Sequence, residues 1–233
     1  FFIKSSSLVA GGLVLPSFNI NRMANSANNK KLKVSVVGCG GRGTGAAVQA
    51  LRADENVELV AMADAFKDRL EKSLNAIKQE FEGEKKIEVK EKNMLVGFNG
   101  YKKAIDLADV VILATPPGFR PLHFKYAIDQ DKHVFMEKPV ATDAHGVRQV
   151  LETAKVANQK KLNVVVGLQR RYQYSYLNIL KQVRRGVIGK ITSGQVRWNG
   201  AGVWVRERQP NQTEMEYHCL LYTSDAADEV VSV

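Results

Sequence analysis

Cysteine is scarce in this 233-residue chain, and its scarcity excludes two classes of protein. Cys39 and Cys219 are too few for a disulfide framework, and neither lies in a spacing typical of a metal site. Cys39 stands in a glycine-rich turn, where a small side chain fits. We therefore expect no redox role for the cysteines and predict no metal centre.

An apolar run long enough to cross a membrane is also missing near the N-terminus. Leu8 to Leu15 is far shorter than the ~20 apolar residues that a membrane-spanning helix needs. Followed by Pro16 and a polar stretch, it suits the hydrophobic region of an export signal. The opening FFIK resembles the part of a twin-arginine signal that follows the arginine pair. We expect residues 1–30 to be an export-signal remnant and linker, and the mature protein to be periplasmic or secreted without a membrane anchor, rather than cytoplasmic.

Basic blocks interleaved with aromatic residues are absent, although the formal net charge is +10. The 34 lysines and arginines are spread over predicted helix faces, often beside acids, as in DAFKDRLEKSLNAIKQEFEGEKK. This distribution is typical of a solvated surface. We expect no nucleic-acid partner.

The last residues do not look like part of a fold. Residues 219–229, CLLYTSDAADE, resemble the conceptual translation of a transposase sequencing adapter; the alternative is an ordinary helix-terminal segment. We expect residues 219–233 to be an artefact and assign no function to His218 or Cys219.

A nucleotide-binding pattern begins at Lys31. The strand-like run LKVSVVG (32–38) is β-branched and apolar, as in a strand buried on both faces. Gly38, Gly40 and Gly43 then form G-x-G-x-x-G at the start of a predicted helix. These glycines allow a tight turn, close approach to a pyrophosphate and close helix–strand packing. The helix N-terminus would offer unpaired N–H groups to phosphate.

Asp64 ends a second predicted strand, VELVAMAD, about 20 residues after the third glycine. An acid at this point accepts hydrogen bonds from the adenosine ribose and repels a 2′-phosphate, so NAD is favoured over NADP. Lys67 and Arg69 leave an opening for NADP. Without the glycine pattern, Asp64 would more simply be a turn or cap residue.

Strand and helix patterns alternate along the rest of this region, which predicts a parallel, doubly wound Rossmann sheet with right-handed crossovers. We place this domain at residues 31–160. The predicted helices cover about 66–82, 99–107, 120–130 and 143–159, and the later strands lie near 87–90, 109–115, 133–136 and 163–168. Ligands bind such sheets at the carboxyl ends of the strands.

Polar residues follow three of these strands: Thr115, Glu137 with Lys138, and Gln169. Beside a nicotinamide, Lys138 could hold a substrate hydroxyl, lower its pKa and help its proton leave as hydride moves to the ring. Glu137 could orient Lys138 or contact the cofactor, and Pro139 fixes the turn. The alternative is a structural ion pair that closes a strand.

These motifs together resemble the Gfo/Idh/MocA family, which includes glucose–fructose oxidoreductase and inositol 2-dehydrogenase. The likeness rests on GCGGRG, Asp64, ATPPGFRPLHFKYAIDQDKHVFMEKPVATD and VVVGLQRR, covers about residues 31–204, and is strongest to exported bacterial members. It implies Lys138 as the catalytic residue and Arg42 near the pyrophosphate. His123 alone would equally be a cap or core histidine. The cofactor-binding residues implied are Gly38, Cys39, Gly40, Gly41, Arg42, Gly43, Asp64, Thr115, Pro116, His123, Glu137, Lys138 and Gln169.

The resemblance also implies a second, mainly antiparallel α+β domain, of which residues 161–218 would be the incomplete start. A helix near 172–185, the turn GVIGK and a strand at 191–199 fit its entry. The family places there an Asp followed four residues later by a histidine base, and this chain has no such pair after Gln169. We therefore expect a fragment truncated at both ends and inactive by itself.

The parent protein is accordingly expected to be an NAD-dependent, homo-oligomeric oxidoreductase that takes hydride from a sugar or cyclitol hydroxyl. Two alternatives stay open. One is a glycosidase that uses NAD transiently; the other is a dinucleotide-binding protein without catalysis.

Overall fold

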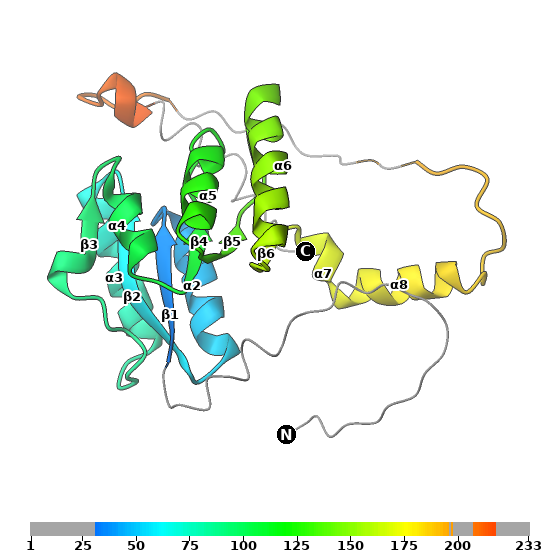
Figure 1. The fold of residues 1–233 in the computed structure, drawn as a ribbon, viewed down its shortest axis with the longest axis horizontal. Helices are drawn as coiled ribbons and strands as arrows, with labels where there is room; N and C mark the ends of the chain where they lie inside the picture. Colours follow the sequence, from blue (N-terminus) through cyan, green and yellow to red (C-terminus); the bar gives the residue numbers. More distant parts are fainter. Residues whose placement is uncertain (1–30, 196, 198–206, 218–233) are drawn as a thin grey trace. The chain divides into compact units, whose positions relative to one another are not determined.

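The computed structural model describes residues 31–195, 197 and 207–217 (Figure 1). The predicted export-signal remnant at 1–30 and the adapter-like segment at 219–233 lie outside the described residues. The division of the chain into domains stays a prediction.

Six parallel strands form one sheet in the order β3-β2-β1-β4-β5-β6. This is the strand order of a classical dinucleotide-binding fold, with its topological switch point between β1 and β4. The predicted doubly wound α/β class is therefore confirmed. The strands are β1 (Leu32–Val37), β2 (Val57–Asp64), β3 (Met94–Val96), β4 (Val110–Leu113), β5 (His133–Met136) and β6 (Val164–Val166).

Helices cover both faces of the sheet and bury one apolar core on each (Figure 1). The core beneath α2 and α3 includes Leu51 and Leu70, and the core beneath α4, α5 and α6 includes Ile105 and Phe124. Most residues of the strands between them are apolar because both faces of the sheet are covered, with the buried Ser35 of β1 an exception. The helices are α2 (Gly41–Ala53), α3 (Lys67–Glu80), α4 (Gly100–Asp106), α5 (Arg120–Asp129) and α6 (Ala144–Gln159).

The third strand was predicted in the wrong place. Residues 87–90 form no strand; Ile87 makes a single bridge to Leu59. A short 3₁₀ helix (Glu91–Asn93) then redirects the chain, and β3 pairs with the carboxyl end of β2. Because β3 has only three residues, its pattern was too short to distinguish from a loop.

Beyond α6 the structure differs in detail from the sequence expectation. β6 pairs with β5, so the sheet extends past residue 160. The predicted helix near 172–185 is two helices, α7 (Gln169–Tyr172) and α8 (Tyr174–Arg184). A turn follows, with Gly186 and Gly189 at positive φ. Residues 191–195 and 197 form no strand, and the remainder of the strand predicted at 191–199 lies outside the described residues.

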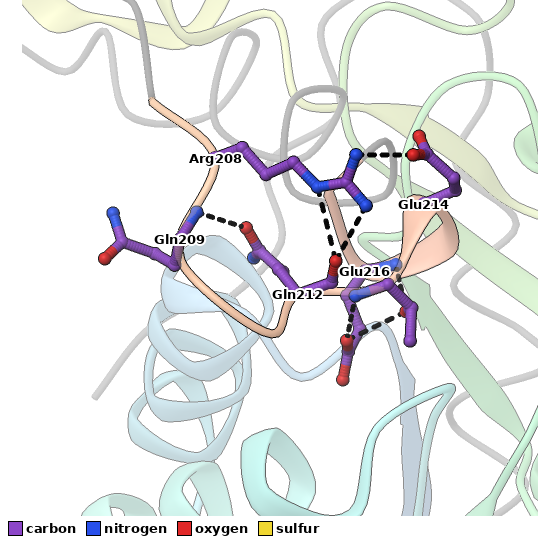
Figure 2. A network of polar contacts seen from close by, with 6 residues as sticks. Arg208, Gln209, Gln212, Glu214 and Glu216 are labelled. Atoms are coloured by element: carbon purple, nitrogen blue, oxygen red, sulfur yellow. Dashed lines mark hydrogen bonds and ion pairs between the residues drawn. The ribbon is translucent and has the colours of Figure 1, made fainter.

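Residues 207–217 form a turn and then one turn of helix at 214–217, stabilised by polar contacts of their own (Figure 2). Arg208 donates to the Gln212 carbonyl oxygen and pairs with Glu214. Thr213 and Glu216 bond reciprocally, as in a helix capping box. The helices within the described ranges include none that is long and apolar enough to cross a membrane.

Candidate functional site

A cavity of about 570 Å³ lies at the carboxyl ends of β1, β2 and β4. This is the switch point of the sheet, and the volume is in the usual range for small-molecule sites. Of the predicted site residues, ten line the cavity: Gly38, Cys39, Gly40, Gly41, Arg42, Gly43, Asp64, Thr115, Pro116 and His123. The described residues that line it do not include Glu137, Lys138 or Gln169.

The glycine loop has the geometry that the motif requires. Gly38 has φ +97°, and a Cβ there would lie 2.6 Å from the Ala114 carbonyl carbon. A Cβ on Gly43 would lie 1.9 Å from the Gly38 carbonyl oxygen, because α2 packs directly on the turn. At Gly40, by contrast, a Cβ would meet nothing within 4 Å. The space above Gly40 is therefore open to a ligand.

The N-terminus of α2 faces this space without a side-chain cap. Its N-cap residue is Gly40, and its first turn contains no acidic residue. The first N–H groups of a helix have no intrahelical acceptors, and the helix dipole adds partial positive charge there. The loop and helix start have room and donors for a pyrophosphate, and the assignment of these residues to phosphate binding stays a prediction.

Asp64 lines the cavity and is held in place by backbone donors. Its Oδ2 accepts a hydrogen bond from the Cys39 amide (2.7 Å) and its Oδ1 one from the Phe66 amide (2.9 Å). A carboxylate oxygen can accept a second bond, so both oxygens can still bind ribose hydroxyls. Burial, and then the charge of Asp64, raise the pKa of the Cys39 thiol well above its usual range, so the thiol stays protonated.

The basic residues near Asp64 are mostly occupied by neighbours. Lys67 pairs with Glu71 (3.7 Å) and Lys72 with Asp68 (3.6 Å) along α3. The Arg69 guanidinium lies over the Phe66 ring, 5.8 Å from its centroid. Arg69 is thus the one cation of these three without an ion-pair partner among the described residues.

An aromatic wall closes the cavity on the α4 and α5 side. The rings of Phe98 and Phe119 lie 5.8 Å apart, and Tyr101 lies 4.2 Å from the ring of His123. His123 Nδ1 shares a hydrogen bond of 3.1 Å with the Thr115 hydroxyl. Burial, with the charge of Arg120 second, lowers the pKa of His123 to about 4, so the imidazole is neutral at neutral pH. The three aromatic residues were missed, because no local motif marks them.

Glu137 is buried and bonded to the glycine loop rather than exposed in the cavity. Its Oε1 accepts a hydrogen bond of 2.7 Å from Arg42 Nε. Gly167 makes room for the carboxylate, since a Cβ there would lie 2.8 Å from Glu137 Oε1. The Arg42 side chain, predicted to lie near the pyrophosphate, lines the cavity but is also committed to this ion pair.

Arg120 was also missed by sequence reasoning. Its side chain is 2% exposed, although arginine at the start of a helix is ordinarily a surface residue. Its two Nη groups donate to the backbone carbonyls of Thr115 and Pro139. The chain around it, GFRPLH, contains no signal for such burial.

Lys138 follows β5 at the carboxyl edge of the sheet and is half-buried. Its ammonium group has no hydrogen-bond or ion-pair partner among the described residues, so it is available to a ligand. The Lys138–Pro139 peptide bond is cis. Gln169 begins α7 and is exposed. Its place beside the nicotinamide stays a prediction.

Clusters of three or more metal-ligating side chains do not occur within the ranges that the structure describes. The polar groups at the site are instead the backbone amides of the glycine loop together with hydroxyl, carboxylate and cationic side chains, among them Thr44, Asp64 and Lys72. These groups fit a dinucleotide and a hydroxylated substrate.

Known proteins are similar to this chain in sequence. The profile of the Gfo/Idh/MocA family, an oxidoreductase family with an NAD-binding Rossmann fold, matches residues 32–168. Inositol 2-dehydrogenase 4 of Saccharopolyspora erythraea is 30% identical over 165 residues, which are 70% of this chain and 44% of the relative. A glycosyl hydrolase family 109 protein of Solibacter usitatus is 25% identical over 195 residues, 79% of this chain and 43% of the relative. The chain spans less than half the length of these relatives.

Solved structures agree with the fold. The scyllo-inositol dehydrogenase of Lactobacillus casei with bound NAD(H) and scyllo-inositol matches with a TM-score of 0.56 and 25% identity, over 70% of this chain and 44% of that one. The myo-inositol 2-dehydrogenase of Lactobacillus plantarum matches with a TM-score of 0.56 and 28% identity, over 70% and 43%. With its sheet order, glycine loop and a family profile that matches more than half of its residues, the chain belongs to the Gfo/Idh/MocA family of NAD-binding oxidoreductases.

Proposed function

We propose that the protein transfers a hydride from a hydroxyl-bearing carbon of a sugar or cyclitol to NAD, with Lys138 as the catalytic residue. One observation carries the proposal: at the carboxyl end of β5, Lys138 has no hydrogen-bond or ion-pair partner among the described residues, in a sheet whose switch point holds a cavity of about 570 Å³. The inositol dehydrogenases among its relatives support the substrate class.

Bound NAD supplies the hydride acceptor. The substrate carbon loses its hydrogen as hydride, its hydroxyl loses a proton to a base, and a carbonyl group forms. The Lys138 ammonium donates a hydrogen bond to the substrate oxygen and stabilises the negative charge that develops there as the proton leaves.

The test compares Lys138→Met with Lys125→Met in the protein encoded by the complete gene. Lys125 is exposed on α5 and pairs with Asp129, so it serves as the control. Lys138→Met is expected to lower kcat about 10²- to 10³-fold, the usual effect of removing a donor that stabilises developing negative charge. Its dissociation constant for NAD, measured by calorimetry, should stay within about twofold of wild type because phosphate binding is elsewhere. Unchanged turnover in Lys138→Met would contradict the role.

NAD is proposed over NADP because Asp64 presents a carboxylate where a 2′-phosphate would lie. Arg69 is the residue that would most readily accept that phosphate. Calorimetric titration should give a dissociation constant for NAD about tenfold or more below that for NADP. Asp64→Ser should reduce the difference between the dissociation constants for NAD and NADP. Equal affinities in the wild-type protein would favour a dual-specificity enzyme instead.

A redox-cycling glycosidase is the second candidate, favoured by the similarity to glycosyl hydrolase family 109 over 79% of the chain. Such an enzyme oxidises its substrate, eliminates the aglycone, adds water and reduces the product, so NADH does not accumulate. Net NADH from a free cyclitol supports the dehydrogenase; release of a chromogenic aglycone without net NADH supports the glycosidase.

A dinucleotide-binding protein without catalysis would bind NAD but give neither signal in either assay.

A homo-oligomeric protein and export by the twin-arginine pathway are proposed on the sequence alone.

A further inference from the structure

Arg120 carries a buried positive charge that the proposed reaction does not use. The side chain is 2% exposed and is the first residue of α5. Burial lowers its pKa to about 10, and the negative charge of Glu137 opposes that shift, so the guanidinium stays charged at neutral pH. A charge in the protein interior is costly unless it is hydrogen-bonded. Its partners therefore indicate its role.

The two partners are carbonyl groups beyond the ends of neighbouring strands. The β4–β5 ladder ends with Leu113 opposite Met136, and the Glu137 amide donates the last bond, 3.0 Å long, to the Leu113 carbonyl oxygen. Beyond this bond, the segments that follow β4 and β5 leave the sheet. Arg120 Nη2 binds the Thr115 carbonyl after β4, and Nη1 binds the Pro139 carbonyl after β5. Its planar fork thus continues the link between the two strands after the ladder has ended.

Lys138 lies between two residues that are each held by an arginine. On its C-terminal side, the Pro139 carbonyl is bound by Arg120. On its N-terminal side, the buried Glu137 carboxylate is bound by Arg42 of the glycine loop. Thr115, the other carbonyl that Arg120 holds, lines the cavity. The turn that carries Lys138 is therefore connected to the cavity wall on both sides.

We propose that Arg120 is a positioning residue: its guanidinium joins the Thr115 and Pro139 carbonyls and so fixes the turn that carries Lys138 at the carboxyl edge of the sheet. The catalytic consequence rests on the proposed function, whereas the structural link does not. Lysine at position 120 keeps the charge near Glu137 but lacks the planar fork, so it cannot hold both carbonyls in the same way.

The experiment compares Arg120→Lys with Arg148→Lys, an exposed arginine on α6, in the protein from the complete gene. Residue-resolved amide exchange should be about tenfold or more faster at Glu137 in Arg120→Lys, because local opening at the end of the ladder becomes easier. The Gly38 amide bonds to the carbonyl of Ala63 in β2, away from the β4–β5 pair. It should exchange at the wild-type rate. Arg148→Lys should match the wild type at both amides.

Kinetics separate positioning from general stability. Arg120→Lys should lower kcat about ten- to a hundredfold, as expected for a misplaced catalytic group, while the dissociation constant for NAD stays within about twofold. Wild-type exchange at Glu137, or wild-type kcat with faster exchange, would overturn the proposal. Should the wild-type protein show no dehydrogenase activity, the proposed function falls, and the exchange comparison still decides whether Arg120 holds the turn.

A measurement on the wild-type protein tests the proposal even if the Arg120→Lys variant does not fold. In ¹⁵N-labelled protein the Arg120 Nη hydrogens should give separate, slowly exchanging signals, because both Nη groups are bonded and buried. A single averaged, rapidly exchanging guanidinium signal, as in free arginine, would overturn the proposal without any substitution.

Discussion

Gly43 and Gly45 both belong to the first turns of α2, but their surroundings differ. A Cβ on Gly43 would lie 1.9 Å from the Gly38 carbonyl oxygen, whereas on Gly45 it would meet nothing closer than 3.4 Å, the tip of the Arg42 side chain. The first contact is against a backbone carbonyl and cannot relax without moving the helix. The second is ordinary van der Waals contact.

Alanine at the two positions should therefore have opposite effects. Gly43→Ala should lower the free energy of unfolding by about 1–3 kcal/mol and abolish measurable NAD binding, because α2 must withdraw from the turn. Gly45→Ala should raise the free energy of unfolding by about 0.5–1 kcal/mol, since glycine is unfavourable inside a helix. Urea unfolding and calorimetry measure both. A Gly43→Ala protein that binds NAD normally would show that this contact is not needed.

His123 should make stability depend on pH. Its pKa is about 4 in the folded protein and about 6.5 when unfolded. Above pH 6.5 both states are neutral and its contribution is complete; as pH falls toward 4 the unfolded state takes up a proton that the folded state does not. Between pH 7.5 and pH 5 this should cost about 2 kcal/mol.

The comparison with His123→Gln isolates this effect from the carboxylates that titrate in the same range. Glutamine can still meet the Thr115 hydroxyl but carries no titrating group. Urea unfolding at the two pH values should show a steeper loss of stability in the wild type. Equal losses in both proteins would mean that His123 is not buried in its neutral form.

At the scale of elements, α2, β5 and β6 meet at the Glu137 carboxylate. Arg42 comes from α2, Glu137 follows β5, and Gly167 follows β6 and leaves the space that the carboxylate occupies. No one of the three elements could form this contact alone. The ion pair can therefore form only when the glycine loop and the carboxyl ends of β5 and β6 are correctly assembled.

Gly167→Ala should disturb that assembly. Its Cβ would lie 2.8 Å from Glu137 Oε1 and push the carboxylate from Arg42, which should cost about 1–3 kcal/mol of stability. NAD binding should weaken as Arg42 is released. Gly118→Ala is the matched control, because its Cβ would meet nothing closer than the Thr142 hydroxyl at 3.9 Å. Equal thermal midpoints for the two variants would rule out the predicted strain.

At the scale of the whole molecule, burial differs between the sheet region, residues 32–168, and helix α8. Residues 32–168 contain two apolar cores, one on each face of the sheet. α8 contributes no buried residue, and its apolar side chains Tyr174, Ile179 and Leu180 are exposed. Isolated helices of this length are marginal in water, so α8 should open far more readily than the helices of the sheet.

Limited trypsin digestion tests this difference. Cleavage after Lys181, Arg184 and Arg185 should be about tenfold or more faster than after Lys72 on α3 or Lys125 on α5. Those two lysines are also exposed, so accessibility alone does not separate the sites. Equal rates at both sets of sites would show that α8 is as stably folded as the sheet.

Much of the fold followed from periodicity. The β-branched runs and the amphipathic stretches between them predicted five of the six strands and all the helices that cover the sheet. β3 was missed because three residues carry too little pattern, and residues 87–90 were apolar enough to imitate a strand. The loop from Gly38 to Gly43 followed from the glycine motif, whose spacing reflects local backbone geometry, whereas the aromatic wall of the cavity did not.

The amino-acid sequence alone determined the doubly wound class, the glycine loop, and the positions of Asp64 and Lys138 at the ends of strands. Each of these features depends on residues that are close together in sequence. Tertiary structure decided the rest. The Arg42–Glu137 pair joins residues 95 positions apart, and Arg120 becomes an interior residue only when α5 packs against the ends of β4 and β5. Such contacts leave no local pattern, since burial of a charge depends on what the folded chain brings around it.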